Sequence, residues 1–167
     1  GIVLQPSRPA PAPATAAGAA PPPPTLTRIE AARGAADEAG VTRWVWSGAG
    51  GGDPKALDAT KDPGLYLAEI WADLEKQVRD TASAAGPERL TYGSARKVLI
   101  NRGVLDEPLT RLLDALHETR NAAAHADGLH LTRAEAAEWG GVALTLSQRI
   151  DQRARMKGLL AAPQPPA

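Results

Sequence analysis

Residues 106–125 read DEPLTRLLDALHETRNAAAH, and this stretch decides the fold class. Its large apolar residues are spaced at intervals of one, three and four: Leu109, Leu112, Leu113 and Leu116. Such spacing places side chains on one face of an α-helix. Asp106 can cap the first turn, where Pro108 also fits because the first N–H groups of a helix have no intrahelical partner. We therefore expect an amphipathic helix that starts near Asp106 and buries its leucines.

A second helix is expected over residues 62–86. It opens with Asp62-Pro63, a capping residue followed by a proline suited to the first turn. Its apolar residues recur at helical intervals until Gly86: Leu67, Ile70, Trp71, Leu74, Val78 and Ala82. The length and period of this pattern predict a buried, amphipathic helix.

Two further helices complete the predicted core. The shorter one spans about residues 91–102, stops at Gly103 and turns three residues inward: Ala95, Val98 and Leu99. The longer one opens with the capping-box sequence of residues 132–135 and ends with three cations suited to the negative end of a helix dipole: Arg153, Arg155 and Lys157. Its expected core residues are Trp139, Val142, Ala143, Leu146 and Ile150. No strand pattern competes within residues 62–157, which predicts an all-α, four-helix bundle.

The flanking segments have a different composition. Residues 1–24 contain eight prolines and seven alanines and are expected to be a disordered tether, and the proline-rich residues 158–167 a disordered tail. Residues 25–61 are expected to be a loosely structured extension, with a short helix that ends at Gly40 and a glycine-rich loop. Within it, Trp44-Val45-Trp46 would dock on the domain, and the glycines that follow do not match a phosphate-binding loop.

Composition excludes several classes of protein. The 167 residues contain no cysteine, which excludes disulfides and thiolate metal sites and favours a reducing, cytoplasmic location. The 19 basic and 19 acidic side chains balance, so no strongly basic nucleic-acid surface is evident in bulk. No apolar run approaches the ~18–20 residues of a membrane-spanning helix.

Arg120 breaks the leucine pattern of residues 106–125. At 100° per residue it falls in the centre of the stripe formed by the leucines, where an unpaired guanidinium is costly. It could be one half of a buried ion pair, with Glu75 on the flank of the preceding long helix as its partner. Alternatively, the stripe opens onto an interface or cleft where Arg120 meets a phosphate.

His125 lies about 140° from Arg120 around a continuous helix, so the two side chains converge only if the helix unwinds or if two copies meet in a dimer. Asn121 precedes His125 by one turn and could orient its imidazole. His125 could also simply satisfy carbonyls of the last helical turn. A metal site is not expected, because the spacing of His117, His125, Asp127 and His130 fits no standard pattern.

The hexapeptide Arg120-Asn121-Ala122-Ala123-Ala124-His125 resembles the Arg-polar-x-x-x-His signature of the HEPN superfamily. The longer sequence LLDALHETRNAAAHADG, with the short helix before it and the capped helix after it, is also similar to the helical, uncharacterised branch of that family. The resemblance covers about residues 63–150 and leaves both tails outside it. It implies a HEPN-like four-helix bundle.

The resemblance also implies a chemistry. Catalytic HEPN proteins are metal-independent ribonucleases that act as homodimers, with two motifs lining one cleft. Carried over, His125 would be a general acid or base, Arg120 would clamp the scissile phosphate, and Asn121 would hold the imidazole or contact the phosphate. The expected products carry a 2′,3′-cyclic phosphate and a 5′-hydroxyl. No metal or cofactor is required.

A non-catalytic dimerisation or regulatory module is the alternative, as part of a larger protein that acts in defence or is tethered to a membrane. Residues 62–157 hold 13 basic and 14 acidic side chains, a poor electrostatic funnel for RNA. No aromatic platform for stacking bases is expected near the motif, because Trp71 and Trp139 fit the core. The proline-rich tether favours attachment to a protein partner or to a further module.

Overall fold

The computed structural model describes residues 24–41, 62–86, 88–125 and 131–161, which form five α-helices and no strand. The helices are α1 (Pro24–Glu38), α2 (Pro63–Ser83), α3 (Tyr92–Asn101), α4 (Glu107–Ala124) and α5 (Arg133–Met156). The predicted all-α class is confirmed. Each of the four helices expected from the sequence is present within a few residues of its predicted bounds.

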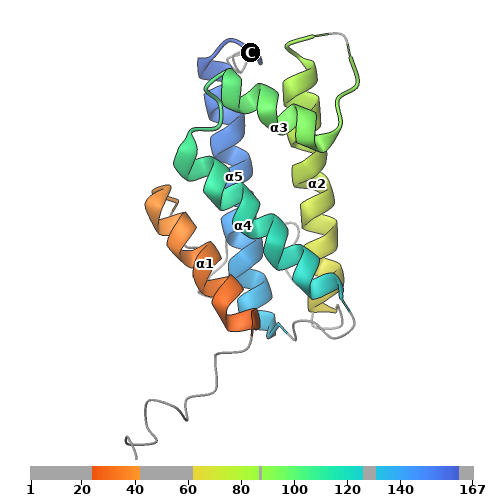
Figure 1. Ribbon diagram of the computed structural model, residues 1–167, viewed down its shortest axis with the longest axis vertical. Coiled ribbons are helices and arrows are strands. Elements are labelled where there is room, and N and C mark those ends of the chain that lie inside the picture. Colours follow the sequence, from red (N-terminus) through yellow and green to blue (C-terminus); the bar gives the residue numbers. More distant parts are fainter. Residues whose placement is uncertain (1–23, 42–61, 87, 126–130, 162–167) are drawn as a thin grey trace, which may run out of the picture.

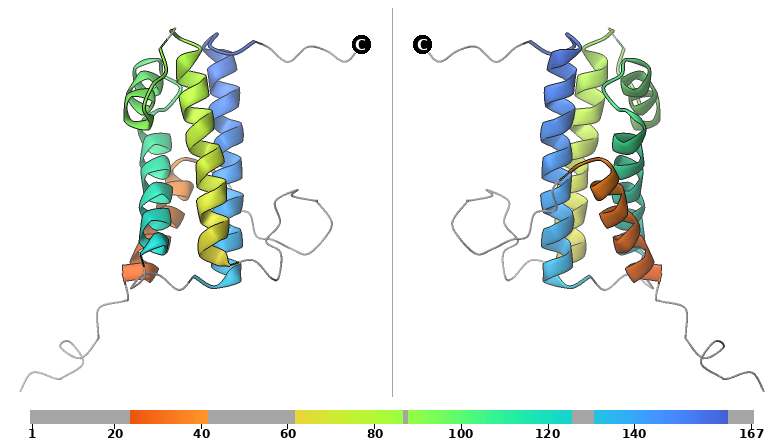
Figure 2. Two further views of the ribbon diagram at one scale, coloured as in Figure 1. Left: turned by 90° about the vertical axis from the view of Figure 1, so that its right-hand side faces the viewer. Right: turned by 90° about the vertical axis from the view of Figure 1, so that its left-hand side faces the viewer.

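The helices form two packed layers (Figures 1 and 2). Helices α2 and α5 lie side by side and start at the same end of the molecule, while α4 runs in the opposite direction across them and ends where they begin. Helix α1 lies beside α4, and the short α3 crosses the other end of the bundle. The C-terminal turn of α4 is therefore placed beside the N-terminal turns of α2 and α5.

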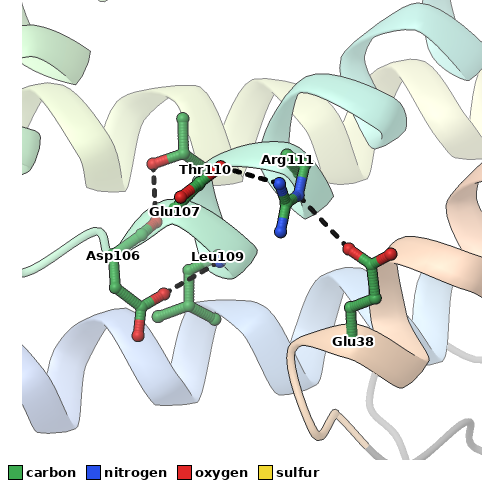
Figure 3. Close-up of polar contacts among 6 residues, drawn as sticks. All are labelled: Glu38, Asp106, Glu107, Leu109, Thr110 and Arg111. Carbon is green, nitrogen blue, oxygen red and sulfur yellow. Dashed lines mark hydrogen bonds and ion pairs between the residues drawn. The ribbon is translucent and has the colours of Figure 1, made fainter.

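Side chains that accept backbone hydrogen bonds fix where the helices start. Asp106 accepts from the N–H of Leu109 at 3.0 Å, and its other carboxylate oxygen accepts from Arg153 of α5 at 2.7 Å. Arg111, one turn further along α4, forms an ion pair with Glu38 of α1 at 3.2 Å (Figure 3). The first two turns of α4 are thus joined to both neighbouring helices.

The core is made of the predicted leucine face of α4 and the facing residues of α2, α3 and α5. Leu109, Leu112, Leu113 and Leu116 are all 1% exposed or less. Thr119 is also fully buried, and its hydroxyl donates to the carbonyl of Ala115 at 2.9 Å, so it leaves no unpaired donor. Each buried aliphatic side chain contributes about 1.5–3 kcal/mol relative to exposure.

The short helix expected before Gly40 is present as α1, and it packs against the bundle where a loosely structured extension was expected. It contributes Ile29, Ala32 and Ala36 to the common core, and Val41, just after the helix, also belongs to that core. Arg33 holds α1 to α5 through a bidentate ion pair with Glu138, at 2.7 and 2.8 Å. Gly40, with φ +65°, ends the helix as predicted. Small alanines pack well but give a weak apolar pattern, so the sequence signal was faint.

Several predicted features fall outside the described residues. These are the tails over residues 1–23 and 162–167, the Trp44-Val45-Trp46 segment with its glycine run, and Asp127 and His130. None of the described helices combines the length and the apolar character needed to cross a bilayer.

Candidate functional site

The last two turns of α4 bring the candidate residues to one end of the bundle. Arg120 and Asn121 lie within the helix, and His125 is its C-terminal cap. Helices α2 and α5 begin at this same end (Figure 1). Helix N-termini carry a partial positive charge, whereas the C-terminal end of α4 itself carries a partial negative charge, so this end of the bundle holds helix ends of both signs.

Arg120 is half-buried and incompletely paired. Its Nη1 donates to the side-chain oxygen of Asn121 at 3.0 Å, whereas its Nε is buried and has no hydrogen-bond partner. An unpaired donor in a buried position carries a free-energy cost of about 1–3 kcal/mol. The sequence analysis anticipated that cost from the position of Arg120 in the leucine stripe.

Several other arginines differ from Arg120 in their pairing. Six of them form ion pairs with carboxylates: Arg33, Arg79, Arg96, Arg111, Arg153 and Arg155. Within the described ranges, Arg120 has no carboxylate within ion-pair distance, although it is partly withdrawn from solvent. Its charge is therefore available to an anionic ligand.

The predicted pairing of Arg120 with Glu75 is wrong. Glu75 pairs with Arg79 on its own helix, at 3.9 Å. A Cβ atom on Gly64 would lie 3.6 Å from the carbonyl of Ala123, so the end of α4 lies beside the first turn of α2. Glu75 is eleven residues further along α2, whereas Arg120 is only three residues from Ala123 in the same direction along the antiparallel α4, so the two are offset by roughly 12 Å at 1.5 Å per residue. The sequence placed both residues near apolar faces but could not fix how far the two helices are offset.

His125 sits where α4 ends. Its backbone is extended, with φ −85° and ψ 137°, and its N–H donates to the carbonyl of Ala122 at 3.4 Å. The helix thus stops at Ala124, close to the unwinding that the sequence analysis required for Arg120 and His125 to converge. His125 is exposed, and its imidazole makes no hydrogen bond to any described residue.

Asn121 is turned toward Arg120 and not toward His125. The hydrogen bond from Arg120 occupies its side-chain oxygen. Of the roles considered for Asn121, the structure therefore shows a contact with the arginine and none with the imidazole. A neutral amide can hold a guanidinium without cancelling its charge, which a carboxylate would do.

His117 is the residue that the sequence analysis underestimated. It was considered only as a metal ligand, yet its imidazole stacks on the indole of Trp71, with ring centroids 4.5 Å apart and an interplanar angle of 3°. Tyr92 contacts both rings edge-on. The spacing of His117, one turn before Asn121, was the available signal, but only the fold shows that Trp71 lies beneath it.

The surroundings of this aromatic cluster are charged but paired. Burial, and then the nearby Asp114 carboxylate, raise the pKa of the Tyr92 phenol, whose hydroxyl is buried without a hydrogen-bond partner. Asp114 itself accepts two hydrogen bonds from Arg96, at 2.9 and 2.6 Å, and these raise the pKa of the Arg96 guanidinium. Arg96 is therefore already paired with a carboxylate, unlike Arg120.

No group of three or more histidine, aspartate or glutamate side chains suited to a metal ion occurs among residues 24–41, 62–86, 88–125 and 131–161. Comparison with known proteins adds no relative: no protein-family model, curated protein or solved structure matches the chain. The function must therefore be argued from the site itself.

Proposed function

We propose that this protein is a HEPN-like, metal-independent endoribonuclease in which Arg120 and His125 act on a phosphodiester of single-stranded RNA. The observation that carries the proposal is the half-buried Arg120, which has no carboxylate partner among the described residues, with an exposed histidine five residues further on at the C-cap of the same helix. A partly buried cation with no carboxylate partner among the described residues is suited to an external anion. The resemblance of residues 120–125 to the HEPN motif supports phosphate as that anion.

In this proposal Arg120 binds the scissile phosphate. A guanidinium donates to two phosphate oxygens at once and stabilises the charge that builds on them in the transition state. The bond from Arg120 to Asn121 engages one amino group and holds the guanidinium plane in place.

His125 transfers the proton. As a base, its imidazole takes the proton of the ribose 2′-hydroxyl, whose oxygen attacks phosphorus, and the bond to the 5′-oxygen breaks as that oxygen is protonated. The products are a 2′,3′-cyclic phosphate and a 5′-hydroxyl, so no water or metal is consumed. Two copies of the chain would supply the acid and the base together, which is why the proposal includes a homodimer. A cytoplasmic location belongs to the same proposal.

The balance of charge favours the alternative, a non-catalytic dimerisation or regulatory module. Residues 62–157 hold 13 basic and 14 acidic side chains, a poor electrostatic funnel for RNA. The assay must therefore separate the two functions.

The test is cleavage of a mixed RNA pool in EDTA by wild type, Arg120→Ala and His125→Ala, with Arg102→Ala as a matched control. Arg102 is an exposed arginine on the C-cap of α3, at the opposite end of the bundle. We expect wild type and Arg102→Ala to leave cyclic-phosphate ends and the two site variants to lose at least about a hundredfold in rate. Absence of cleavage by folded wild type, or equal cleavage by all four proteins, would rule out the nuclease.

A further inference from the structure

The stacked rings of Trp71 and His117 lie at the junction of α2 and α4, one helical turn before Arg120. We infer that His117 forms a base-stacking subsite, which receives a nucleobase of the single-stranded RNA whose phosphate contacts Arg120. The inference rests on the proposed function and extends it, because it names the part of the RNA that the protein recognises beyond the phosphate.

The core fixes the plane of the His117 ring. Trp71 is 2% exposed, and its indole lies parallel to the imidazole at a centroid distance of 4.5 Å. Tyr92 packs edge-on against the imidazole, at 5.4 Å and 68°, and against the indole, at 5.6 Å and 71°. A side chain that is already held flat loses little conformational entropy when a ligand stacks on it.

Part of the same ring remains open to a ligand. His117 is half-buried, and the indole covers one of its faces while Tyr92 covers an edge. We therefore place the nucleobase on the face of the imidazole opposite Trp71. The imidazole makes no hydrogen bond to a described residue, so no internal polar contact competes with a ligand. Trp71, which was expected only in the core, is itself buried, but its indole supports the imidazole of His117 on which the base would stack.

The spacing between His117 and Arg120 suits one nucleotide. Residues three and four apart share a side of a helix, so His117 neighbours both Arg120 and Asn121. The axial rise from His117 to Arg120 is about 4.5 Å at 1.5 Å per residue. A nucleotide whose phosphate lies on the guanidinium can reach the imidazole with its own base or with the adjacent one.

The ligand class follows from the contact. Aromatic side chains stack on any base, and a purine offers a larger π surface than a pyrimidine. The nearby Arg96 and Asp114 neutralise each other through two hydrogen bonds, so they add little to phosphate binding at this position. The subsite should therefore bind the nucleobase, whereas Arg120 binds a phosphate of the RNA backbone.

The experiment measures RNA affinity in full-length protein carrying His125→Ala, which in the proposed mechanism leaves the RNA intact. Three fluorescein-labelled probes of equal length are titrated: oligoadenylate, oligouridylate and an abasic ribose-phosphate oligomer. We expect the order adenylate, uridylate, abasic. His117→Ala should weaken oligoadenylate about tenfold and bring the three affinities together, since a single stacked base contributes about 1–3 kcal/mol and tenfold corresponds to 1.4 kcal/mol. His117→Phe, which keeps an aromatic ring, should retain the order.

Arg120→Ala is the contrasting variant and should weaken all three probes by the same factor. If His117→Ala folds, as judged by circular dichroism, and keeps the preference for adenylate, the subsite is refuted while phosphate binding by Arg120 stands. If no probe binds the parent protein, both the subsite and the proposed function fail. If the base preference depends on His117 but wild type never cleaves RNA, the subsite holds and the catalytic proposal alone is refuted.

Discussion

Substitution of Gly140 by alanine tests a close contact between the two long helices. A Cβ atom built on Gly140 of α5 would lie 2.2 Å from the hydroxyl oxygen of Tyr66 on α2, and 2.9 Å from two of its ring carbons. Carbon atoms normally approach to about 3.5–4.0 Å, so the ring or the helix must move. Tyr66 is only 3% exposed, which leaves its ring no free space on the solvent side.

The expected magnitude combines two opposing effects. Overpacking of a tight core costs about 1–3 kcal/mol, and the clash at Gly140 places it at the upper end. Alanine is better than glycine within a helix by about 1 kcal/mol, which offsets part of that cost. We expect a net loss of about 2 kcal/mol in the free energy of unfolding. In a chain of this length, that loss lowers the Tm by roughly 4–8 °C.

The assay is urea unfolding followed by far-ultraviolet circular dichroism, with Gly34→Ala as the matched control. Gly34 is an exposed helical glycine of α1, and a Cβ atom there would have no neighbour within 4 Å. It should gain up to about 1 kcal/mol from helix propensity alone. Adding Tyr66→Phe to Gly140→Ala removes the nearest atom and should recover part of the loss. Equal stability of Gly140→Ala and wild type would refute the packing argument.

Three further predictions concern the caps, the buried phenol and α1. Asp106→Ala should lower the free energy of unfolding by about 1.5–2 kcal/mol, and Asp62→Ala by about 1 kcal/mol. Both variants lose an N-cap, but only Asp106→Ala also loses an ion pair with another helix. Equal losses in urea unfolding would show that the ion pair contributes nothing. Burial raises the pKa of the Tyr92 phenol above its ordinary value of 10.0, so the unfolded chain loses the phenol proton at a lower pH than the folded protein does. The free energy of unfolding should therefore fall as the pH rises above 10, and Tyr92→Phe should reduce this fall. An unchanged dependence of stability on pH in Tyr92→Phe would contradict the prediction. Arg33→Met removes the ion pair between α1 and Glu138 and should lower the free energy of unfolding by up to about 1 kcal/mol. Amide hydrogen exchange in α1 should become faster. Unchanged protection of these amides would show that apolar packing alone holds the helix.

The sequence by itself determined the helices. The intervals between leucines in residues 106–125, together with Asp62, Asp106 and Thr132 at helix starts, depend only on local geometry, so they could be recognised without a fold. It also indicated Arg120 as an exception, because a charge within an apolar stripe stands out in one dimension. Its resemblance to a known motif supplied the reaction that we propose.

Only the tertiary structure decided which residues meet. The offset between α2 and α4 set Gly64 beside Ala123, and thereby separated Glu75 from Arg120 and placed Trp71 under His117. The same is true of α1, whose small side chains gave little sequence signal but pack fully against their neighbours. Periodicity fixes the direction of a side chain around its own helix axis. The position of one helix along another is set by the packing of all their side chains together, and no local pattern contains it.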